Sequence, residues 1–259
     1  MRSELKPFLE DFLSKGSTQY LPHLSIDCVI FAYEEQQLQV LLTKVWGHDA
    51  LALPGGFIGK QEDIDHAAAR TLQERTGLKE IFLQQFRTFG LAERAFQEEI
   101  YPTLDKLGIE RQKASWMMGR YVTIGYYALL RKADAKVKVG PLDEDLLWAD
   151  ALNLPPMVID HEQIIQQACQ LLQEELVRKP IAERLLPDQF TIPELQALYE
   201  TILDRSIDRG NFRKKVLKAD ILQKLDKRKE GGAHRAPQLY QFHPAHYAES
   251  LEQQVKLGF

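Results

Sequence analysis

The segment that most restricts the possible folds is a strand, a turn and a helix in immediate succession. Residues 51–57, LALPGGF, are typical of a short strand that runs into a Gly-Gly turn. Residues 63–76 follow the spacing of an amphipathic helix, with Ala67, Ala68 and Leu72 on one side. Gly77 supplies the stop signal of a helix C-terminus. The pattern therefore predicts a strand, a tight turn and a helix ending at a glycine.

The same segment carries a regular pattern of charged and aliphatic residues. Residues 56–78 read GFIGKQEDIDHAAARTLQERTGL. This frame resembles the Nudix box, G-x5-E-x7-R-E-U-x-E-E-x-G-U, in which U is a bulky aliphatic residue. Seven of its nine defined positions are in register, namely Gly56, Glu62, Arg70, Leu72, Glu74, Gly77 and Leu78. The resemblance covers residues 24–155, and it implies an α+β fold with a mixed sheet between helices.

Two positions of the box depart from the family pattern. In active members, the resemblance implies, glutamates at positions 71, 74 and 75 share one helix face and hold Mg²⁺ against a diphosphate. Here the chain has Thr71 and Arg75. A cation about 4 Å from Mg²⁺ costs on the order of 8 kcal/mol at an effective dielectric constant of 20. We therefore expect no metal, no cofactor and no catalytic residue, and a Nudix domain that binds a ligand without hydrolysing it.

Three alternatives stay open at this stage. Metal ligands could come from other acidic residues, and Arg70 and Glu74, four positions apart on the helix, could simply form an ion pair. The guanidinium of Arg75 could also hold a phosphate directly in place of a metal. The other acidic candidates are Glu62, Glu93, Glu98 and Glu99.

Apolar periodicity predicts the elements around the box. Helices are expected at residues 4–13 and 160–177, and a hairpin is expected from the strands 25–33 and 38–45. Further strands are expected at 83–89, 121–130, 137–139 and 146–149. Residues 94–119 are expected to form a long loop that could contain one helix. The expected organisation is an N-terminal helix (1–22), a Nudix-like ligand-sensing domain (23–156), a linker helix (157–179), a winged helix-turn-helix domain (180–247) and a tail (248–259).

The C-terminal part predicts two helices followed by a β-hairpin. Thr191 and Glu194 form a capping box at the start of a helix over 190–203. Asp208 is a second N-cap, and the helix that follows, 209–217, is docked by Phe212 and Val216. Strands over 221–226 and 238–242 enclose a basic, glycine-rich connection. This order is that of a winged helix-turn-helix, in which the second helix enters the major groove and the hairpin forms the wing.

Charge supports a nucleic-acid partner for this part. The chain has a net charge of −4, but residues 205–259 carry +6 and the rest −10. Asn211 and Lys214 project away from the docking face and are expected to read bases. The predicted DNA-binding residues are Arg209, Asn211, Arg213, Lys214, Lys215, Lys229 and Arg235. The alternative is a small helical oligomerisation domain with a solvated charge run.

Composition bounds the cellular context. No run approaches 18 apolar residues, and the first residues place acids inside their apolar pattern, so neither a membrane span nor a secretory signal is expected. Cys28 and Cys169, 141 positions apart in apolar surroundings, are expected to be buried free thiols in a reducing cytoplasm.

A degenerate Nudix box followed by such a module resembles the Nudix-related transcriptional regulators. Residues 185–216, LLPDQFTIPELQALYETILDRSIDRGNFRKKV, carry the C-terminal part of the resemblance, and the Asp160-His161 helix start resembles the interdomain element. The resemblance implies a homodimeric repressor that binds a palindromic double-stranded DNA operator and senses a sugar or an ADP-ribose-like metabolite. It places the ligand-binding residues at Arg75, Arg87, Phe89 and Arg120.

Two competing functions follow from the same features. One is a Nudix hydrolase of a nucleoside-diphosphate-linked compound with an accessory basic domain, against which Thr71 and Arg75 argue. The other is an RNA-binding regulator, which a recognition helix with a wing suits less well than B-form DNA. The chain departs from the regulator pattern in the 94–119 stretch and in its N-terminal helix.

Overall fold

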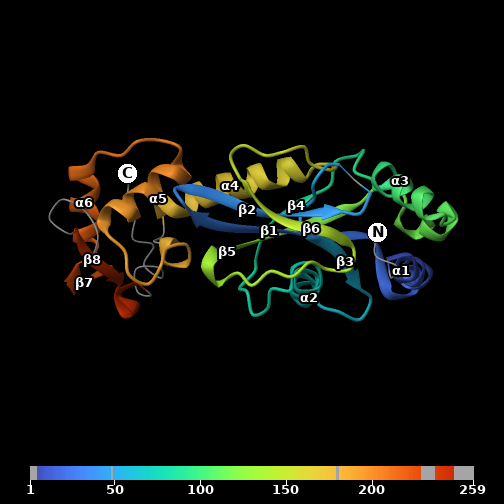
Figure 1. Cartoon of the computed structure of the whole chain (residues 1–259), viewed down its shortest axis with the longest axis horizontal. Helices are drawn as coiled ribbons and strands as arrows, with labels where there is room; N and C mark the ends of the chain where they lie inside the picture. The colour runs from blue at the N-terminus through green and yellow to red at the C-terminus, as the bar shows by residue number, and fades with distance from the viewer. Residues whose placement is uncertain (1–4, 48, 179–180, 229–236, 248–259) are drawn as a thin grey trace. The chain divides into compact units, whose positions relative to one another are not determined.

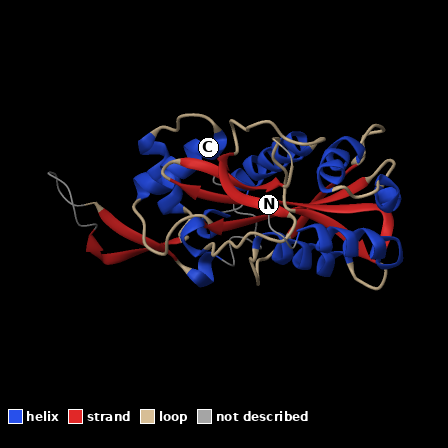
Figure 2. Cartoon of the chain, turned by 45° about the vertical axis from the view of Figure 1, so that its right-hand side comes forward, coloured by secondary structure: helices blue, strands red, loops and turns tan. Residues whose placement is uncertain are grey.

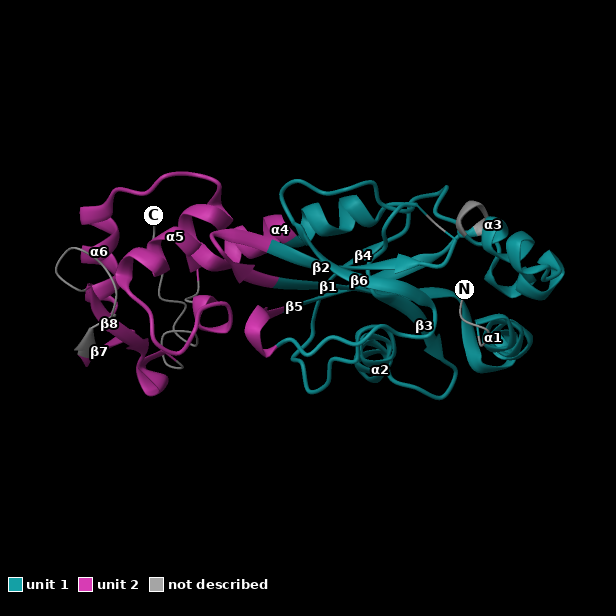
Figure 3. Ribbon diagram, in the orientation of Figure 1, with its two compact units in different colours: residues 1–31, 39–128, 135–168 teal, residues 32–38, 129–134, 169–259 magenta. Residues whose placement is uncertain are grey.

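The computed structural model describes residues 5–47, 49–178, 181–228 and 237–247, and the side chains of residues 97–99, 227 and 228 are outside that description. The chain divides into two compact units (Figures 1 and 3). The first comprises residues 1–31, 39–128 and 135–168, and the second comprises residues 32–38, 129–134 and 169–259. Residues 32–38 and 129–134, which the sequence places within the Nudix-like range, thus belong to the second unit.

A six-stranded mixed sheet forms the centre of the first unit, with helices on both sides (Figure 2). The order is β4-β5-β1-β2-β6, and β3 pairs antiparallel with β1. Residues 25–32 of β1 are all buried, as expected for a strand covered on both faces. The strands are β1 (Tyr20–Glu34), β2 (Gln37–Val45), β3 (Gly55–Gly59), β4 (Gln84–Phe89), β5 (Val122–Arg131) and β6 (Asp143–Asp150).

The predicted hairpin and the helix of the Nudix-like box are confirmed. Glu35 and Gln36 connect β1 and β2, both with positive φ, as a tight hairpin turn requires. Helix α2 (Ile64–Thr76) ends at Gly77, whose left-handed φ of 72° lets its N–H reach the carbonyl of Gln73. The other helices that contribute to the first unit are α1 (Leu5–Gln19), α3 (Gln97–Leu107), the 3-10 helix η1 (Arg111–Met117) and the first part of α4 (His161–Arg178).

Three local expectations are wrong. The Gly-Gly pair at 55–56 is not a turn but the start of β3, because its backbone pairs with β1. Residues 94–119 hold two helices, α3 and η1, whose apolar faces pack against α1. Residues 137–139 are not a strand. There the N–H of Lys138 donates to the carbonyl of Thr76 (2.7 Å), so this segment completes the C-terminal end of α2 instead of a sheet.

The second unit contains the predicted helix-turn-helix and hairpin. The capping box is present: Thr191 Oγ1 accepts from the Glu194 N–H, and the Glu194 carboxylate accepts from the Thr191 N–H (2.8 Å). Tyr199 and Phe212 join the two helices edge to face, with ring centroids 5.5 Å apart. The remaining elements are η2 (Lys132–Asp134), η3 (Ile181–Arg184), α5 (Ile192–Leu203), α6 (Arg209–Lys218), β7 (Leu222–Arg228) and β8 (Gln238–Phe242).

Candidate functional site

The acidic residues of the Nudix-like box are held by Arg70. Its guanidinium donates to Glu62 (2.8 Å), Glu74 (3.0 Å) and the carbonyl of Phe57 (2.7 Å). The hydrogen bond from Arg70 lowers the pKa of Glu62. Glu62 and Glu74 are thus counter-ions of one arginine, which matches the structural pairing left open above for Arg70 and Glu74.

Arg75 lies where active Nudix enzymes carry a glutamate, and it is a structural clamp. Its guanidinium makes four hydrogen bonds: two to the carboxylate of Asp143 (2.5 and 2.7 Å), one to the carbonyl of Gly55 (2.9 Å) and one to Thr43 Oγ1 (3.2 Å). Burial raises the pKa of Asp143, and the guanidinium opposes that rise. Because four of its five N–H groups are in use, Arg75 is poorly placed to hold a phosphate.

Thr71 fills the other position at which active members have a glutamate. It is buried, and a Cβ built on Gly56 would lie 2.7 Å from its hydroxyl oxygen, so the space beside the β3 backbone is closed. Over the described residues, no group of three or more His, Cys, Asp or Glu side chains could hold a metal ion. Glu93 is exposed, and the side chains of Glu98 and Glu99 lie outside the described residues.

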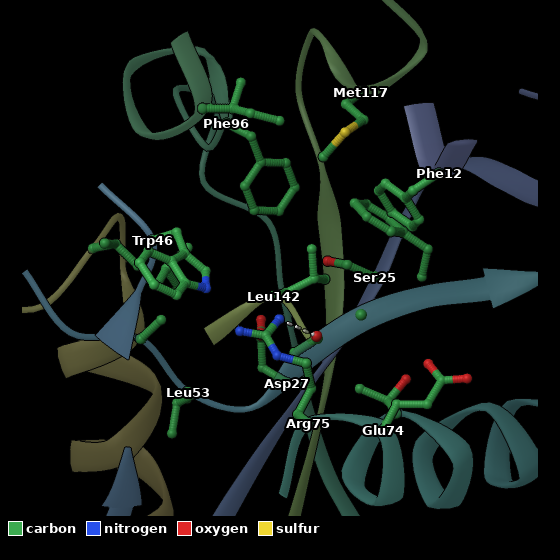
Figure 4. Close-up of a pocket in the computed structure, with 18 of the residues that line it drawn as sticks. Phe12, Ser25, Asp27, Trp46, Leu53, Glu74, Arg75, Phe96, Met117 and Leu142 are labelled. Carbon is green, nitrogen blue, oxygen red and sulfur yellow. Dashed lines mark hydrogen bonds between the residues drawn. The ribbon is translucent and has the colours of Figure 1, made fainter. Parts of the chain in front are cut away.

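A cavity of about 210 Å³ opens between the sheet, α2 and the segments that cover them (Figure 4). Its upper wall in the figure is apolar, with Phe12, Phe96 and Met117, and its floor holds Asp27 and Arg75. Helix α1 and the segment 100–117 supply much of the apolar wall, so both parts that depart from the regulator pattern contribute to the cavity. Their remaining contributions are Leu5, Leu9, Ile100, Thr103 and Leu104.

Three of the residues that line the cavity carry buried polar atoms without a partner among the described residues. Trp46 Nε1, Thr71 Oγ1 and His161 Nε2 all belong to side chains that line it, and each lacks a hydrogen-bond partner within the described part of the chain. A buried polar group left unpaired costs about 1–3 kcal/mol. In Figure 4 the nitrogen of Trp46 points toward the middle of the cavity. A ligand that reached these atoms would restore hydrogen bonds.

A buried ion network adjoins the cavity through Asp27. Arg94 is fully buried, and it donates to Asp27 (2.8 Å) and to both carboxylate oxygens of Asp160 (2.9 and 3.1 Å). Sequence reasoning missed Arg94 and Asp27, since neither belongs to a motif. The Asp160-His161 pair was noticed only as a helix start, although His161 lines the cavity.

Three of the four predicted ligand-binding residues do not line this cavity. Arg87 donates to Gln167, Phe89 is buried against Phe86, and Arg120 donates to the carbonyl of Gly90 (2.7 Å). Two of them lie on β4, an edge strand, whereas the cavity is built on β1, β3 and α2. The structure therefore brings only Arg75 of this set to the cavity.

The predicted recognition helix presents a basic face. Phe212 and Val216 are fully buried, while Asn211, Arg213 and Lys214 are exposed, as is Arg209; Lys215 is half-buried. The carboxylate of Asp208 accepts from the N–H of Asn211 (2.7 Å) and so caps α6 at its first turn. Lys229 and Arg235, predicted at the wing, lie outside the described residues.

Comparison with known proteins agrees with this two-part organisation. Residues 21–145 match the model of the NUDIX domain, and residues 182–242 match that of the NrtR DNA-binding winged helix domain. The chain is 29% identical over 228 residues to the "ADPR responsive transcriptional repressor NtrR" of Acinetobacter baylyi, a match that covers 85% of this chain and 82% of that protein.

Two solved structures resemble nearly the whole chain. The structure of Shewanella oneidensis NrtR complexed with a 27mer DNA has a TM-score of 0.65 and 27% identity, covering 87% of this chain and 95% of the other. A MutT/nudix family protein from Enterococcus faecalis has a TM-score of 0.61 at 22% identity, covering 94% and 99%, and shows the fold alone.

A Nudix domain joined to a winged helix-turn-helix defines a DNA-binding regulator that responds to a ligand. The chain belongs to the Nudix-related transcriptional regulators, as its two motifs predicted. None of the helices in the described part of the chain combines the length and the apolar character that a membrane span requires.

Proposed function

We propose that the protein is a repressor whose affinity for its operator is set by a metabolite of the ADP-ribose type, bound in the cavity of the first unit. The printed name of the Acinetobacter relative, an ADPR-responsive repressor similar over most of both chains, supports this effector. A free monosaccharide is the competing effector, since the cavity is compact beside the ~300–1,000 Å³ of common ligand sites. As a DNA-binding protein with bacterial relatives, it is proposed to act in the cytoplasm.

The observation that supports ligand binding rather than hydrolysis is the set of hydrogen bonds that Arg75 makes. Its hydrogen bonds to Asp143 and Gly55 hold a positive charge at a position where active members have a metal-binding glutamate. Thr71 cannot replace the second carboxylate. A hydrolase with an accessory basic domain is therefore the weaker proposal.

For the operator, we propose that Asn211 and Lys214 read base edges in the major groove. Arg209, Arg213 and Lys215 would contact the neighbouring phosphates, and Lys229 and Arg235 of the wing would contact phosphates or a narrow minor groove. A homodimer would bind a palindrome whose half-sites lie one or two helical turns apart.

Titration of operator binding tests the effector. A duplex is selected in vitro from a randomised pool, and its affinity is measured with increasing ADP-ribose. We expect a shift of roughly 5- to 150-fold, whereas a scrambled duplex should show little change. Saturating ADP-ribose should also stabilise the protein by about 2.7 kcal/mol at 100 times its Kd. If ADP-ribose binds but operator affinity stays constant, ADP-ribose is not the effector.

A separate assay tests the absence of hydrolysis. The protein is incubated with Mg²⁺ and ADP-ribose or dinucleoside polyphosphates, and nucleotide release is followed. No metal-dependent turnover is expected, because too few carboxylates remain to hold the ion. Turnover that disappears in Glu74→Ala would make the protein a hydrolase.

A further inference from the structure

His161 lies where the ligand cavity meets helix α4. It is 4% exposed, lines the cavity and is the first residue of the helix. Residues 161–168 of α4 belong to the first unit and residues 169–178 to the second. A ligand that touches His161 therefore touches the beginning of a helix that both units share.

The position of the proton on His161 follows from its partners. Burial lowers the pKa of His161, so the ring is neutral at neutral pH and carries one N–H. Nδ1 accepts a hydrogen bond from the backbone N–H of Leu53 (2.9 Å), so the proton must be on Nε2. Among the described residues, Nε2 has no hydrogen-bond partner, and the nearest carboxylate oxygen, Asp27 Oδ1, is 3.6 Å away.

The surroundings of Nε2 select the chemistry of the group it can bind. Trp46 Nε1 is a second N–H donor at the cavity without a partner in the described chain, so the ligand must offer acceptors. The carboxylate of Asp27 disfavours an anion there, and the guanidinium groups of Arg70 and Arg75 are paired with carboxylates. A neutral hydroxyl fits best, because it accepts from His161 and can donate to Asp27.

We propose that a neutral hydroxyl of the effector accepts the hydrogen bond of His161 Nε2–H, and that this bond transmits effector binding to α4. The inference rests on the proposed function, in which this cavity binds the effector. It places the sugar hydroxyls of an ADP-ribose-type ligand, and not its diphosphate, next to α4.

The buried ion network connects the site of this hydroxyl to the start of helix α4. Asp27, beside Nε2, is bonded to Arg94, and Arg94 is bonded to Asp160, the residue that precedes His161. A hydroxyl that bonds both Asp27 and His161 would thus redistribute hydrogen bonds on both sides of the first residue of α4. No comparable link joins Trp46 to the helix in the described contacts, so Trp46 contributes affinity only.

Two substitutions of His161 distinguish the roles of its two ring nitrogens. His161→Asn keeps an acceptor near Nδ1 for Leu53 and removes the Nε2 donor, whereas His161→Gln keeps an N–H donor near the position of Nε2. His66→Asn, on the exposed side of α2, is the matched control. Full-length proteins are compared for thermal stability, for binding of ADP-ribose, D-ribose and L-arabinose, and for affinity to the selected operator with and without these probes.

We expect His161→Asn to bind the active probe about 10-fold more weakly or worse and to lose the probe-dependent shift in operator affinity. The control variant His66→Asn should leave probe binding and operator affinity within about 2-fold of the wild type, less than the loss of one typical hydrogen bond. His161→Gln should retain most of the response. Trp46→Phe should weaken probe binding but keep the operator shift once saturated, which tests the proposal even if His161→Asn folds poorly.

Several outcomes would overturn the proposal. Undiminished probe affinity in His161→Asn removes His161 from the site, and weaker affinity with a full operator shift at saturation removes its transmitting role. If none of the three probes binds the wild type, the hydroxyl assignment is wrong. If a pentose acts and ADP-ribose does not, only the ADP-ribose effector of the proposed function fails, and the same variants decide the proposal with the pentose.

Discussion

Arg75 and Asp143 form an ion pair beneath the cavity, with side chains 12% and 0% exposed. Removing one partner of a buried pair leaves the other charge without compensation, which typically costs about 3–5 kcal/mol. Arg75→Ala should therefore lower the free energy of unfolding by that amount, as measured by urea denaturation. Arg70→Ala, which removes a more exposed pair with Glu62 and Glu74, should cost only about 1 kcal/mol. Equal losses in the two variants would mean that Arg75 is not a structural clamp.

The protonation of His161 predicts a pH dependence of stability. Burial, reinforced by Arg94 and Arg75 and opposed by Asp27 and Asp160, holds the pKa of His161 below its ordinary value in the folded state. As pH falls below about 6.5, the unfolded chain takes up a proton that the folded chain does not. The wild type should therefore lose stability toward acid, by at most about 1.4 kcal/mol per pH unit from this residue.

The measurement compares wild type with His161→Asn between pH 5 and 8. The two proteins share every other ionisable group, so the difference between their unfolding free energies isolates His161. That difference should be constant at high pH and change in favour of the variant as pH falls. Parallel curves would show that the folded protein binds the proton at His161 as readily as the unfolded chain.

At the scale of elements, the sequence predicts those whose signals are local. The helix α2 with Gly77, the capping box of α5 and the Asp208 cap of α6 each follow from a few adjacent residues. The cavity depends on side chains brought together from distant segments, such as Trp46 with His161, and no local sequence pattern predicts it. For the same reason the partner of Arg75, Asp143, could not be predicted, although the presence of Thr71 and Arg75 at two glutamate positions of the Nudix box is visible in the sequence itself.

The packing of α1 against η1 illustrates such a non-local contact. A Cβ built on Gly16 would lie 2.0 Å from the ring of Trp116, whose Nε1 donates to the carbonyl of Leu13 (3.0 Å). Because Tyr20 and Phe57 also contact this ring, it has little room to move. Gly16→Ala should destabilise by about 1–3 kcal/mol, despite the better helix propensity of alanine.

Urea unfolding followed by tryptophan emission measures this effect. Ser14→Ala, on the exposed side of α1, is the matched control and should be nearly neutral. The emission spectrum of folded Gly16→Ala should also shift, since Trp116 must leave its site. A stabilised Gly16→Ala variant would show that α1 is not held against η1.

We expect the recognition helix to make two kinds of DNA contact. Asn211→Ala should cost roughly 1–3 kcal/mol on the operator, with little effect on a scrambled duplex, if the side chain reads a base. Arg213→Ala should weaken both duplexes alike and reduce the salt slope by about one ion. Titrations at several salt concentrations measure both effects. Lys79→Ala removes one exposed charge from the first unit and controls for net charge. Equal losses on both duplexes for Asn211→Ala would contradict base reading.

For the whole molecule, the ligand cavity and the recognition helix belong to different units, and the chain between them is continuous through α4. If effector and operator each prefer one state of the protein, the two bindings are linked through a single coupling free energy. Its size does not depend on which ligand binds first. A ligand-responsive regulator must therefore show equal changes in its two binding affinities, and this can be measured only on the protein that contains both domains.

The two ligands should change each other's affinity by the same factor, roughly 5- to 150-fold. ADP-ribose affinity is measured by calorimetry for the free protein, for the protein saturated with operator and for the protein with a scrambled duplex. Operator affinity is measured in parallel, with and without saturating ADP-ribose. The ratio of the ADP-ribose Kd values with and without operator must equal the ratio of the operator Kd values with and without ADP-ribose, because the four equilibria form one thermodynamic cycle. His161→Asn should bring both ratios close to one. Ratios of one in the wild type would leave it a DNA-binding protein that ADP-ribose does not regulate.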